Sequence, residues 1–402
     1  MKVLIVVHGH PQYSHGGGEV AAYAMYDALK KAGHSAYILA WNNQPNAGEE
    51  GRSIVQVANN EWMISTKTDF FTFSSTDLDA IEAYKTLITS LKPDVIHFHH
   101  YVHLGIELPG LAKALLPKVK TFLTLHEYLL ICNNNGQMIK TDGQLCESSS
   151  PQACNKCFPS ISPEAFFMRE GYLKNCLSSI DLMICPSHFL MERYLAWGIP
   201  KNKITYLENI LSINKSKAQK SKYDKIKTFG YFGQINYYKG LDILLDAMEL
   251  IAHLAPKIRL HINGNFSSIN SPQFQKELEA KIENLGEMVD FKGPYSNTSL
   301  FSRMDQVGWL VMSSRWWENS PVVIQEALAN KTPLILPNIG GMEEKINKNG
   351  FLYEAKDPES LSKVLLKAST IKQADYNKLN LSSEAEDKSL VNKLVTMYKG
   401  SL

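Results

Sequence analysis

The sequence lacks three features, and each absence argues against a class of protein. None of its apolar stretches approaches the roughly 20 residues that a membrane-spanning helix needs. Neither half contains the Gly-x-Gly-x-x-Gly fingerprint of dinucleotide-binding folds or the acidic residue that should follow it, which argues against a dinucleotide-dependent oxidoreductase. The net charge is only +2, so charge gives no reason to expect nucleic acid as a partner.

The chain has 402 residues, which is too long for one ordinary core and suits two domains. Its hydrophobic fraction of 44% and charged fraction of 20% are typical of a soluble globular protein. The N-terminal MKVLIVVHGH has too short an apolar run for a signal peptide and is typical of a first β-strand. We therefore expect a cytoplasmic protein, whose six cysteines are thiols or metal ligands before they are disulfides.

Short apolar runs alternate with helical patterns along the chain, which favours an α/β fold with two doubly wound domains. The predicted domains are residues 1–208 and 228–382, joined by a linker at 209–227 and followed by an amphipathic helix within 383–402. The linker contains six lysines, within residues 212–227, and we expect it to be solvated, with attraction to anionic lipid as the alternative. The expected strands lie at 2–8, 35–41, 94–100, 120–125, 182–186 and 203–207, then at 228–233, 259–263, 289–292, 307–312 and 334–336; residues 42–75 have no clear pattern.

The most informative stretch, residues 307–344, predicts a strand, a loop, a helix and a second strand. The apolar run from Val307 to Met312 is long enough for one buried strand. The loop after it leads into Ser320-Pro321, the pattern of an N-cap serine followed by proline at the first helical position. We expect the helix to end before Pro333. Such a unit places ligands at the carboxyl edge of an open α/β sheet.

The loop and the helix start carry groups suited to a phosphorylated ligand. The N–H groups of Val322 and Val323 would face the loop, in a geometry that suits a phosphate. Glu326 lies about a turn and a half into the helix, and its side chain leans back toward the N-terminus. Its carboxylate is therefore expected to meet that of Glu318 across one pocket. The alternative is two solvated surface glutamates.

In the first half, the candidate site residues follow strand ends. The Gly17-Gly18 turn precedes a helix, where glycine lets the backbone approach a phosphate or sugar closely; an ordinary turn is the alternative. His126 and Glu127 follow the strand at 120–125. Three more histidines end the strand at 94–100: His97, His99 and His100. They would either line the same edge or, as is more common for histidines at strand ends, be packed in the core or solvated.

Residues 128–158 form a loop-like insertion that contains four of the six cysteines: Cys132, Cys146, Cys154 and Cys157. The last two form a Cys-x-x-Cys pair. A loop of this length without secondary structure needs another source of order, and four thiolates around Zn²⁺ would provide it. A structural zinc ion is therefore the favoured interpretation, followed by unligated thiols and then by an iron–sulfur cluster.

The spacing from Glu318 to Glu326, with its flanking strand, helix and Gly340-Gly341 turn, resembles the Glu-x7-Glu motif of the retaining GT-B glycosyltransferases. The resemblance is closest to glycosyltransferase family 4, also called glycosyl transferases group 1, and covers nearly the whole chain. It implies two facing Rossmann-like doubly wound domains with an interdomain cleft. The first would bind the acceptor and the second the nucleotide sugar, and the helix within 383–402 would cross back to the first domain.

This resemblance also implies roles for individual residues. Glu318 would contact the donor sugar, Glu326 the ribose hydroxyls and Lys239 the donor diphosphate. His126 would hydrogen-bond the donor sugar near the reacting carbon. Gln234 stands where the family often has arginine, and glutamine cannot neutralise phosphate, so more of the charge falls on Lys239. The other expected donor-binding residues are Gly17, Gly18, Tyr295 as a stacking partner for the base, Asn319, Ser320, Pro321 and Val322.

The implied activity is that of a retaining hexosyltransferase acting on a hydroxyl of a glycan or lipid-linked glycan, as in cell-surface polysaccharide synthesis. A UDP-sugar is the favoured donor and GDP-mannose the alternative. No cofactor is expected for catalysis, because the Asp-x-Asp pair Asp77 and Asp79 lies in a first helical turn, where acidic residues suit the helix dipole. Peripheral contact with the inner membrane face is the alternative to a freely cytoplasmic protein. The alternative function is a zinc-dependent nucleotide-sugar-binding protein with a degenerate, non-catalytic cleft.

Overall fold

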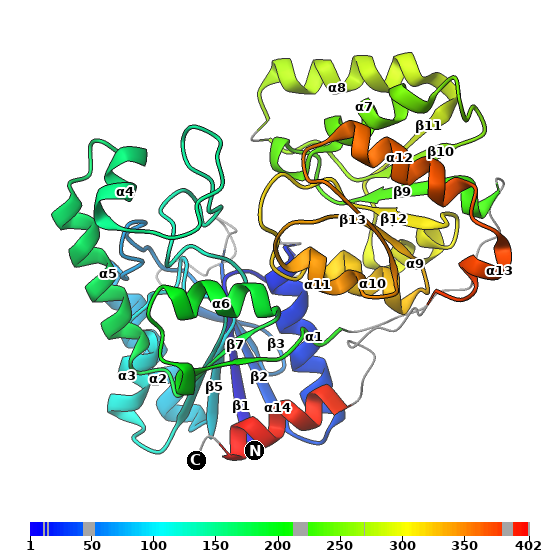
Figure 1. Cartoon of the computed structure of the whole chain (residues 1–402). Helices are drawn as coiled ribbons and strands as arrows, with labels where there is room; N and C mark the ends of the chain where they lie inside the picture. The colour runs from blue at the N-terminus through cyan, green and yellow to red at the C-terminus, as the bar shows by residue number, and fades with distance from the viewer. Residues whose placement is uncertain are drawn as a thin grey trace. The chain divides into compact units, whose positions relative to one another are not determined.

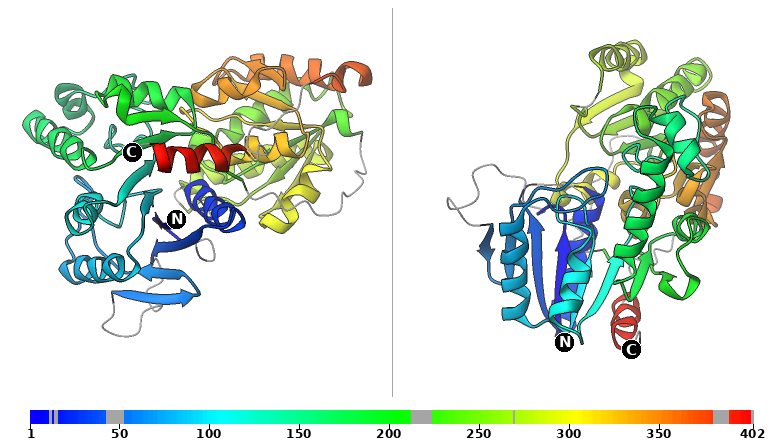
Figure 2. Two further views of the ribbon diagram at one scale, coloured as in Figure 1. Left: turned by 90° about the horizontal axis from the view of Figure 1, so that it is seen from below. Right: turned by 90° about the vertical axis from the view of Figure 1, so that its left-hand side faces the viewer.

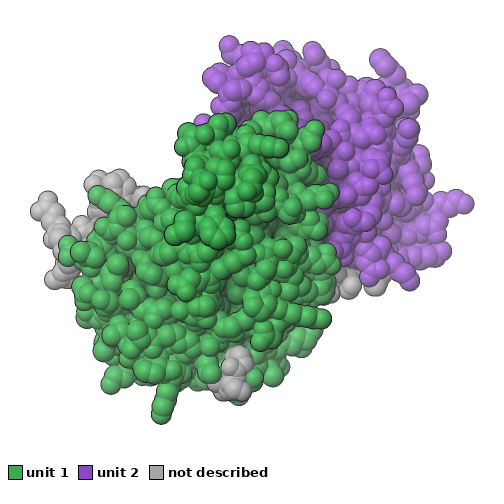
Figure 3. Space-filling model, turned by 60° about the vertical axis from the view of Figure 1, so that its left-hand side comes forward, with its two compact units in different colours: residues 1–212, 387–402 green, residues 213–386 purple. Residues whose placement is uncertain are grey.

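The structure is a computed structural model of the chain, and it describes residues 1–10, 13, 16–42, 53–211, 224–268, 270–379 and 389–400. The chain divides into two compact units, residues 1–212 with 387–402 and residues 213–386 (Figure 1, Figure 3). Most of the expected linker falls on residues 212–223, which lie outside the described residues. Within the described ranges, none of the helices is both long and apolar enough to cross a bilayer.

The first unit is an eight-stranded sheet with helices packed against it. Its strands are β1 (Lys2–Val7), β2 (Ser35–Trp41), β3 (Ile54–Ala58), β4 (Glu61–Ile64), β5 (Val95–Phe98), β6 (Lys120–Thr124), β7 (Leu182–Cys185) and β8 (Ile204–Tyr206). Its helices are α1 (Gly17–Lys31), α2 (Leu78–Leu91), α3 (Leu108–Leu115), α4 (Pro151–Cys157), α5 (Pro163–Leu177), α6 (His188–Ala196), the 3₁₀ turn η1 (Lys201–Lys203) and α14 (Ser389–Gly400). The strand order is β3-β4-β2-β1-β5-β6-β7-β8, and only the β3–β4 pair is antiparallel among these described strands.

The strands that could be predicted from the sequence are the buried ones. Residues 3–7 of β1 are fully buried, so both faces of this central strand are covered and its sequence is continuously apolar. The β3–β4 hairpin lies within the stretch that had no clear pattern. Much of β3 is exposed at the edge of the sheet, so it lacks the apolar alternation that marks a half-buried strand.

The helix α14 belongs to the first unit, although the chain reaches it only after the second. It lies alongside α1 (Figure 2), and Leu390, Leu394 and Tyr398 pack into the core that β1, β2 and α1 form. The hydroxyl of Tyr398 lies 2.6 Å from Nδ1 of His97 in β5. The last helix therefore supplies both apolar packing and a polar partner to the centre of the first sheet.

The second unit is a six-stranded parallel sheet. Its strands are β9 (Thr228–Phe232), β10 (Arg259–Asn263), β11 (Val289–Gly293), β12 (Trp309–Val311), β13 (Leu334–Pro337) and β14 (Gly350–Tyr353), in the order β11-β10-β9-β12-β13-β14. The helices are α7 (Leu241–Ile251), α8 (Pro272–Leu285), α9 (Asn297–Met304), α10 (Val322–Ala329), α11 (Glu343–Ile346), α12 (Pro358–Ser369) and α13 (Gln373–Tyr376). Four 3₁₀ turns are η2 (Lys225–Lys227), η3 (Tyr237–Lys239), η4 (Gly286–Met288) and η5 (Gly340–Met342). The core includes the fully buried Trp309, whose Nε1 donates to the Ile226 carbonyl at 3.0 Å.

Leu394→Ala should lower the free energy of unfolding by about 2–5 kcal/mol, because the side chain is fully buried and its truncation leaves a cavity. Asn392→Ala, at an exposed position of the same helix, is the matched control and should change little. Urea denaturation of the full chain measures both variants. Equal midpoints for the two would contradict the packing of α14 into the first unit.

Candidate functional site

In the second unit, the expected donor-binding residues follow the carboxyl ends of three strands. Gln234 and Lys239 come after β9, Glu318 after β12 and Gly340 after β13. These three strands are consecutive neighbours in a parallel sheet, so their following loops leave the sheet at one edge. Ligands of open α/β sheets bind at this edge.

The carboxylate of Glu318 is the centre of the polar contacts at this edge. Its Oε1 accepts from Lys239 Nζ at 2.5 Å, from Ser314 Oγ at 2.8 Å and from Trp316 Nε1 at 2.8 Å. Burial alone would raise the pKa of Glu318, but the Lys239 charge and these hydrogen bonds hold it below its ordinary value. Glu318 is therefore a buried, ionised carboxylate whose Oε1 is held by three donors.

Trp316 is a site residue that the sequence analysis did not identify. Besides donating to Glu318, its indole ring stacks on Tyr238, with centroids 5.4 Å apart. Lys239 Nζ lies 5.6 Å from the centroid of the same indole. The only sequence signal was an aromatic residue two positions before the acidic one, which by itself does not distinguish a packed ring from a hydrogen-bond donor.

The backbone at Glu318 needs a glycine in the next strand-end loop. Gly340 has φ of 63°, and a Cβ there would lie 2.9 Å from the Glu318 carbonyl oxygen. The N–H of Gly341 donates to the same oxygen at 2.8 Å. The Gly340-Gly341 turn therefore holds the loop that carries Glu318.

The predicted start of the following helix was wrong. Ser320 does not cap α10; the helix begins at Val322, and Pro321 holds the N-cap position with extended ψ and no side-chain cap. The Gln325 side-chain amide donates to the Ser320 hydroxyl at 3.1 Å. Asn319 and Ser320, which follow Glu318 in sequence, are both buried.

The second carboxylate of the motif has a different environment. Burial raises the pKa of Glu326 to about 7. Burial, with the charge of Glu326 as a smaller cause, raises the pKa of Tyr295, whose ring packs against that of Phe232 at 5.7 Å between centroids. The expectation that Glu318 and Glu326 face one ligand pocket stays a prediction. Gln234 accepts from Asn236 Nδ2 at 3.3 Å.

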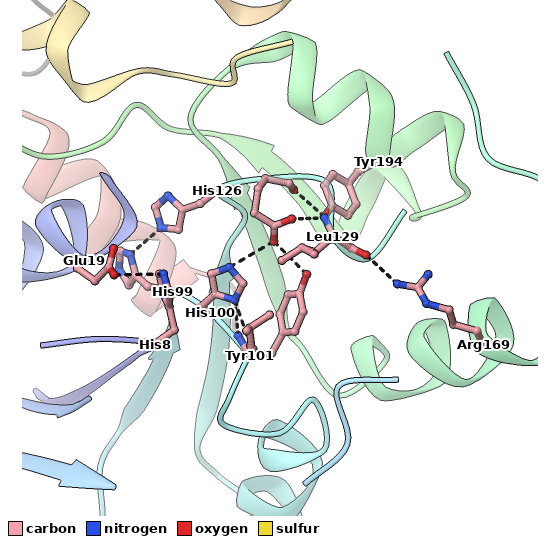
Figure 4. Close-up of polar contacts among 11 residues, drawn as sticks. His8, Glu19, His99, His100, Tyr101, His126, Leu129, Arg169 and Tyr194 are labelled. Atoms are coloured by element: carbon pink, nitrogen blue, oxygen red, sulfur yellow. Dashed lines mark hydrogen bonds and ion pairs between the residues drawn. The ribbon is translucent and has the colours of Figure 1, made fainter. Parts of the chain in front are cut away.

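In the first unit, four histidines gather where three neighbouring strands end (Figure 4). Nδ1 of His99 lies 3.0 Å from Nε2 of His126. His8 Nε2 lies 3.4 Å from Glu19 Oε1, and the His8 ring packs on that of His100 at 4.2 Å. The three contacts link residues that follow β1, β5 and β6. Sequence analysis identified His126 as a site residue but did not identify His8 or Glu19.

Burial makes these histidines neutral near physiological pH. It lowers the pKa of His126 to about 3 and the pKa values of His99 and His100 well below the ordinary value, with the neighbouring imidazoles adding to the effect. They can therefore donate and accept hydrogen bonds, but they bring no positive charge to a ligand.

Gly18 lets the start of α1 approach His126. A Cβ at this position would lie 3.1 Å from Cε1 of His8 and 3.5 Å from Cδ2 of His126. The Gly17-Gly18 turn is the first turn of α1, where N–H groups have no partner within the helix. The structure thus brings the predicted glycine turn and the predicted histidine together.

Glu127 follows His126 and fixes the chain that leads into the insertion. Burial raises its pKa to about 7, against hydrogen bonds from the Leu129 N–H and the Tyr101 hydroxyl. The guanidinium of Arg169 donates to the carbonyls of Leu129 at 2.7 Å and Leu130 at 2.9 Å. Sequence analysis did not identify the role of Arg169, because its partners are backbone groups that no side-chain pattern reveals.

The four cysteines of the insertion line one cavity of about 450 Å³. All four are free thiols of intermediate exposure. Among the described residues, no group of three or more His, Cys, Asp or Glu side chains is already arranged to hold a metal ion. The zinc ion expected from the sequence stays a prediction.

Two family models match consecutive parts of the chain. Residues 15–214 match the family described as Glycosyltransferase Family 4, and residues 212–381 match Glycosyl transferases group 1. An uncharacterized glycosyltransferase of Haemophilus influenzae is 24% identical over 362 residues, which cover 88% of this chain and 86% of that protein. Protein CapJ of Staphylococcus aureus is 26% identical over 240 residues, which cover 54% of this chain and 57% of CapJ.

Solved structures agree with these matches in fold. HepE of Anabaena in complex with UDP aligns over 100% of both chains with a TM-score of 0.68 and 17% identity. Sucrose-phosphate synthase of Thermosynechococcus elongatus aligns over 99% of this chain and 98% of its own, with a TM-score of 0.68 and 17% identity. The chain therefore belongs to the group 1 and family 4 glycosyltransferases, and its two doubly wound units have the GT-B fold.

Proposed function

We propose that the protein is a retaining glycosyltransferase that moves a sugar from a UDP-sugar to a hydroxyl of a glycan or lipid-linked glycan. The observation that carries the proposal is the contact of Lys239 with Glu318 at the carboxyl edge of the second sheet. HepE, which has the same fold, has been crystallised with UDP and with UDP-glucose. These complexes favour a uridine donor over GDP-mannose.

The donor nucleotide would be held by groups of the second unit. The ammonium of Lys239 and the N–H groups at the start of α10, near Val322, would face the diphosphate, since both favour negative charge. Glu326 would accept from the ribose hydroxyls, and Tyr295 would stack on the base. Gln234 adds a hydrogen bond without charge, so Lys239 carries most of the neutralisation.

Donor binding would also change the environment of Glu318. The diphosphate draws Lys239 away from the carboxylate, while Trp316 and Ser314 still hold Oε1 by hydrogen bonds. The remaining oxygen, Oε2, has none of these three contacts and is the atom we assign to a hydroxyl of the donor sugar. The sugar is then oriented by a carboxylate that two neutral donors keep in place.

The chemical step exchanges one bond at the anomeric carbon for another. The bond to the β-phosphate oxygen breaks, the acceptor oxygen bonds to the same face of the sugar, and the acceptor proton passes to the leaving phosphate. The products are UDP and a glycoside of retained configuration. Since the phosphate takes the proton, the protein needs no separate general base and acts through positioning and through charge at the diphosphate.

In the first unit, His126 and the Gly17-Gly18 turn would contact the transferred sugar. His126 would act as a neutral hydrogen-bonding group, because burial lowers its pKa to about 3. A neutral imidazole suits this role, since it can donate a hydrogen bond to a sugar hydroxyl or accept one from it.

UDP in large excess should raise the melting temperature of the full chain, whereas GDP should not. A ligand at about 100 times its dissociation constant adds about 2.7 kcal/mol to the stability of the native state. Thermal-shift measurements with each nucleotide test the donor class. A shift with GDP alone would replace UDP by GDP in the proposal, and a shift with neither would contradict the assigned nucleotide site.

Lys239→Ala and Glu318→Ala should each lower turnover at least tenfold, because each removes a group that contacts the donor, in line with single-residue losses at charge-stabilising sites. Lys257→Ala, at an exposed position of the same unit, is the control. The measurement is UDP release from UDP-glucose, with circular dichroism to confirm folding. Near-normal rates in folded Lys239→Ala and Glu318→Ala proteins would remove the basis of the proposal.

UDP should bind about tenfold more tightly at pH 8 than at pH 6. With a pKa of about 7, only about one tenth of Glu326 is ionised at pH 6, and ribose hydroxyls donate to the ionised form. Glu326→Gln has no such titration and should lose most of this dependence. Calorimetry of both proteins cancels the titration of the nucleotide itself, and an unchanged slope in Glu326→Gln would disprove the role assigned to this carboxylate.

A further inference from the structure

The cysteine-bearing insertion brings thiols from three separate backbone segments to one cavity. Cys132 lies in a turn, where its N–H donates to the Tyr128 carbonyl at 2.7 Å. Cys146 ends a small hairpin, where its N–H donates to the Met138 carbonyl at 2.7 Å. Cys154 and Cys157 lie in α4, three positions apart and therefore on the same face of the helix. All four residues line the cavity.

The four thiols share the lining of this one cavity. The cluster does not include the other two cysteines, Cys176 in α5 and Cys185 in β7, which do not line the cavity. The cysteines that line the cavity are therefore those of the insertion.

Apolar burial does not account for the order of α4. The helix has seven residues and buries none of them fully. A helix this short is marginal without tertiary support, and the face that carries Cys154 and Cys157 looks into the cavity. The helix packs against α5, and a ligand that joined its cysteine face to Cys132 and Cys146 would add a second support.

We propose that Cys132, Cys146, Cys154 and Cys157 bind one Zn²⁺ ion that stabilises the insertion. Four thiolates at the corners of a tetrahedron are a preferred structural site for this ion, with zinc–sulfur distances of about 2.3 Å. The described side chains line the cavity without yet converging on one point, so binding includes rotation of the thiols toward the ion.

Zinc binding by this cluster is a proton exchange without a redox change. Four S–H bonds break and four zinc–sulfur bonds form, and the four protons pass to the buffer. The net charge of the occupied site is then −2. No oxidant or reductant takes part, which separates this site from an iron–sulfur cluster or a disulfide.

The ion would act on structure near the candidate site without joining its chemistry. The insertion begins directly after His126 and Glu127 and contains the Leu129 and Leu130 carbonyls that Arg169 holds. A zinc ion would fix the far end of this segment. The proposal stands independently of the proposed sugar transfer, because its readouts are metal content and stability.

The test is the metal content of the full chain purified after expression with added zinc. Elemental analysis should find about one zinc per chain, as the four-ligand site requires. Cys154→Ser and Cys157→Ser should each lose most of it, whereas Cys176→Ser should keep it. A chain with less than about a tenth of an equivalent, or with iron and a visible absorption band in its place, would overturn the proposal.

A measurement on the unaltered protein keeps the test valid if the serine variants fail to fold. A chelator should lower the melting temperature and make four more thiols reactive toward a thiol reagent, and added Zn²⁺ should reverse both effects. If the four thiols react equally before and after chelation, they are unligated and the assignment fails.

Discussion

A parallel sheet returns the chain to the same edge after every strand, and this constraint gathers the candidate site in each unit. His99 follows β5 and His126 follows the adjacent β6, so their imidazoles meet at 3.0 Å although 26 residues separate them in sequence. Lys239 follows β9 and Glu318 follows the adjacent β12. No local pattern is needed for these contacts, because strand order alone brings the loops together.

Burial opposes charge in both units, and it raises the pKa of Glu326 in the second unit to about 7; Glu318 is an exception. In the first, burial keeps His99, His100 and His126 neutral, and it raises the pKa of Glu127 to about 7. In the second, the Lys239 ammonium counters the desolvation of Glu318, so the carboxylate stays ionised although it is buried. An ion pair at such a site costs desolvation, and loss of the Lys239 ammonium would leave a buried carboxylate without its counter-charge.

Most of the buried strands and the two-domain organisation could be predicted from the sequence. Individual side-chain contacts could be predicted less well. Buried strands such as β1 are continuous apolar runs, so two doubly wound α/β domains could be predicted from their alternation with helical patterns. The GT-B fold was implied by the family resemblance, and the comparisons confirmed it. The role of Trp316 could not be predicted, because the sequence does not show which acceptor its indole N–H contacts in the folded chain. The helix after Ser320 begins one residue later than predicted, with Pro321 at the N-cap position. Arg169 binds main-chain carbonyls, which leave no trace in a side-chain pattern.

The core of the first unit is closed by a segment that the ribosome makes after the whole second unit. The strands and α1 emerge early, but Leu394 and the Tyr398 hydroxyl that meets His97 follow only after residues 213–386. At about 5–20 residues per second, the early part waits roughly ten seconds or more with this face uncovered. The first unit therefore cannot complete its core until α14 has been synthesised. A chain that stops before α14 exposes apolar surface to chaperones and proteases.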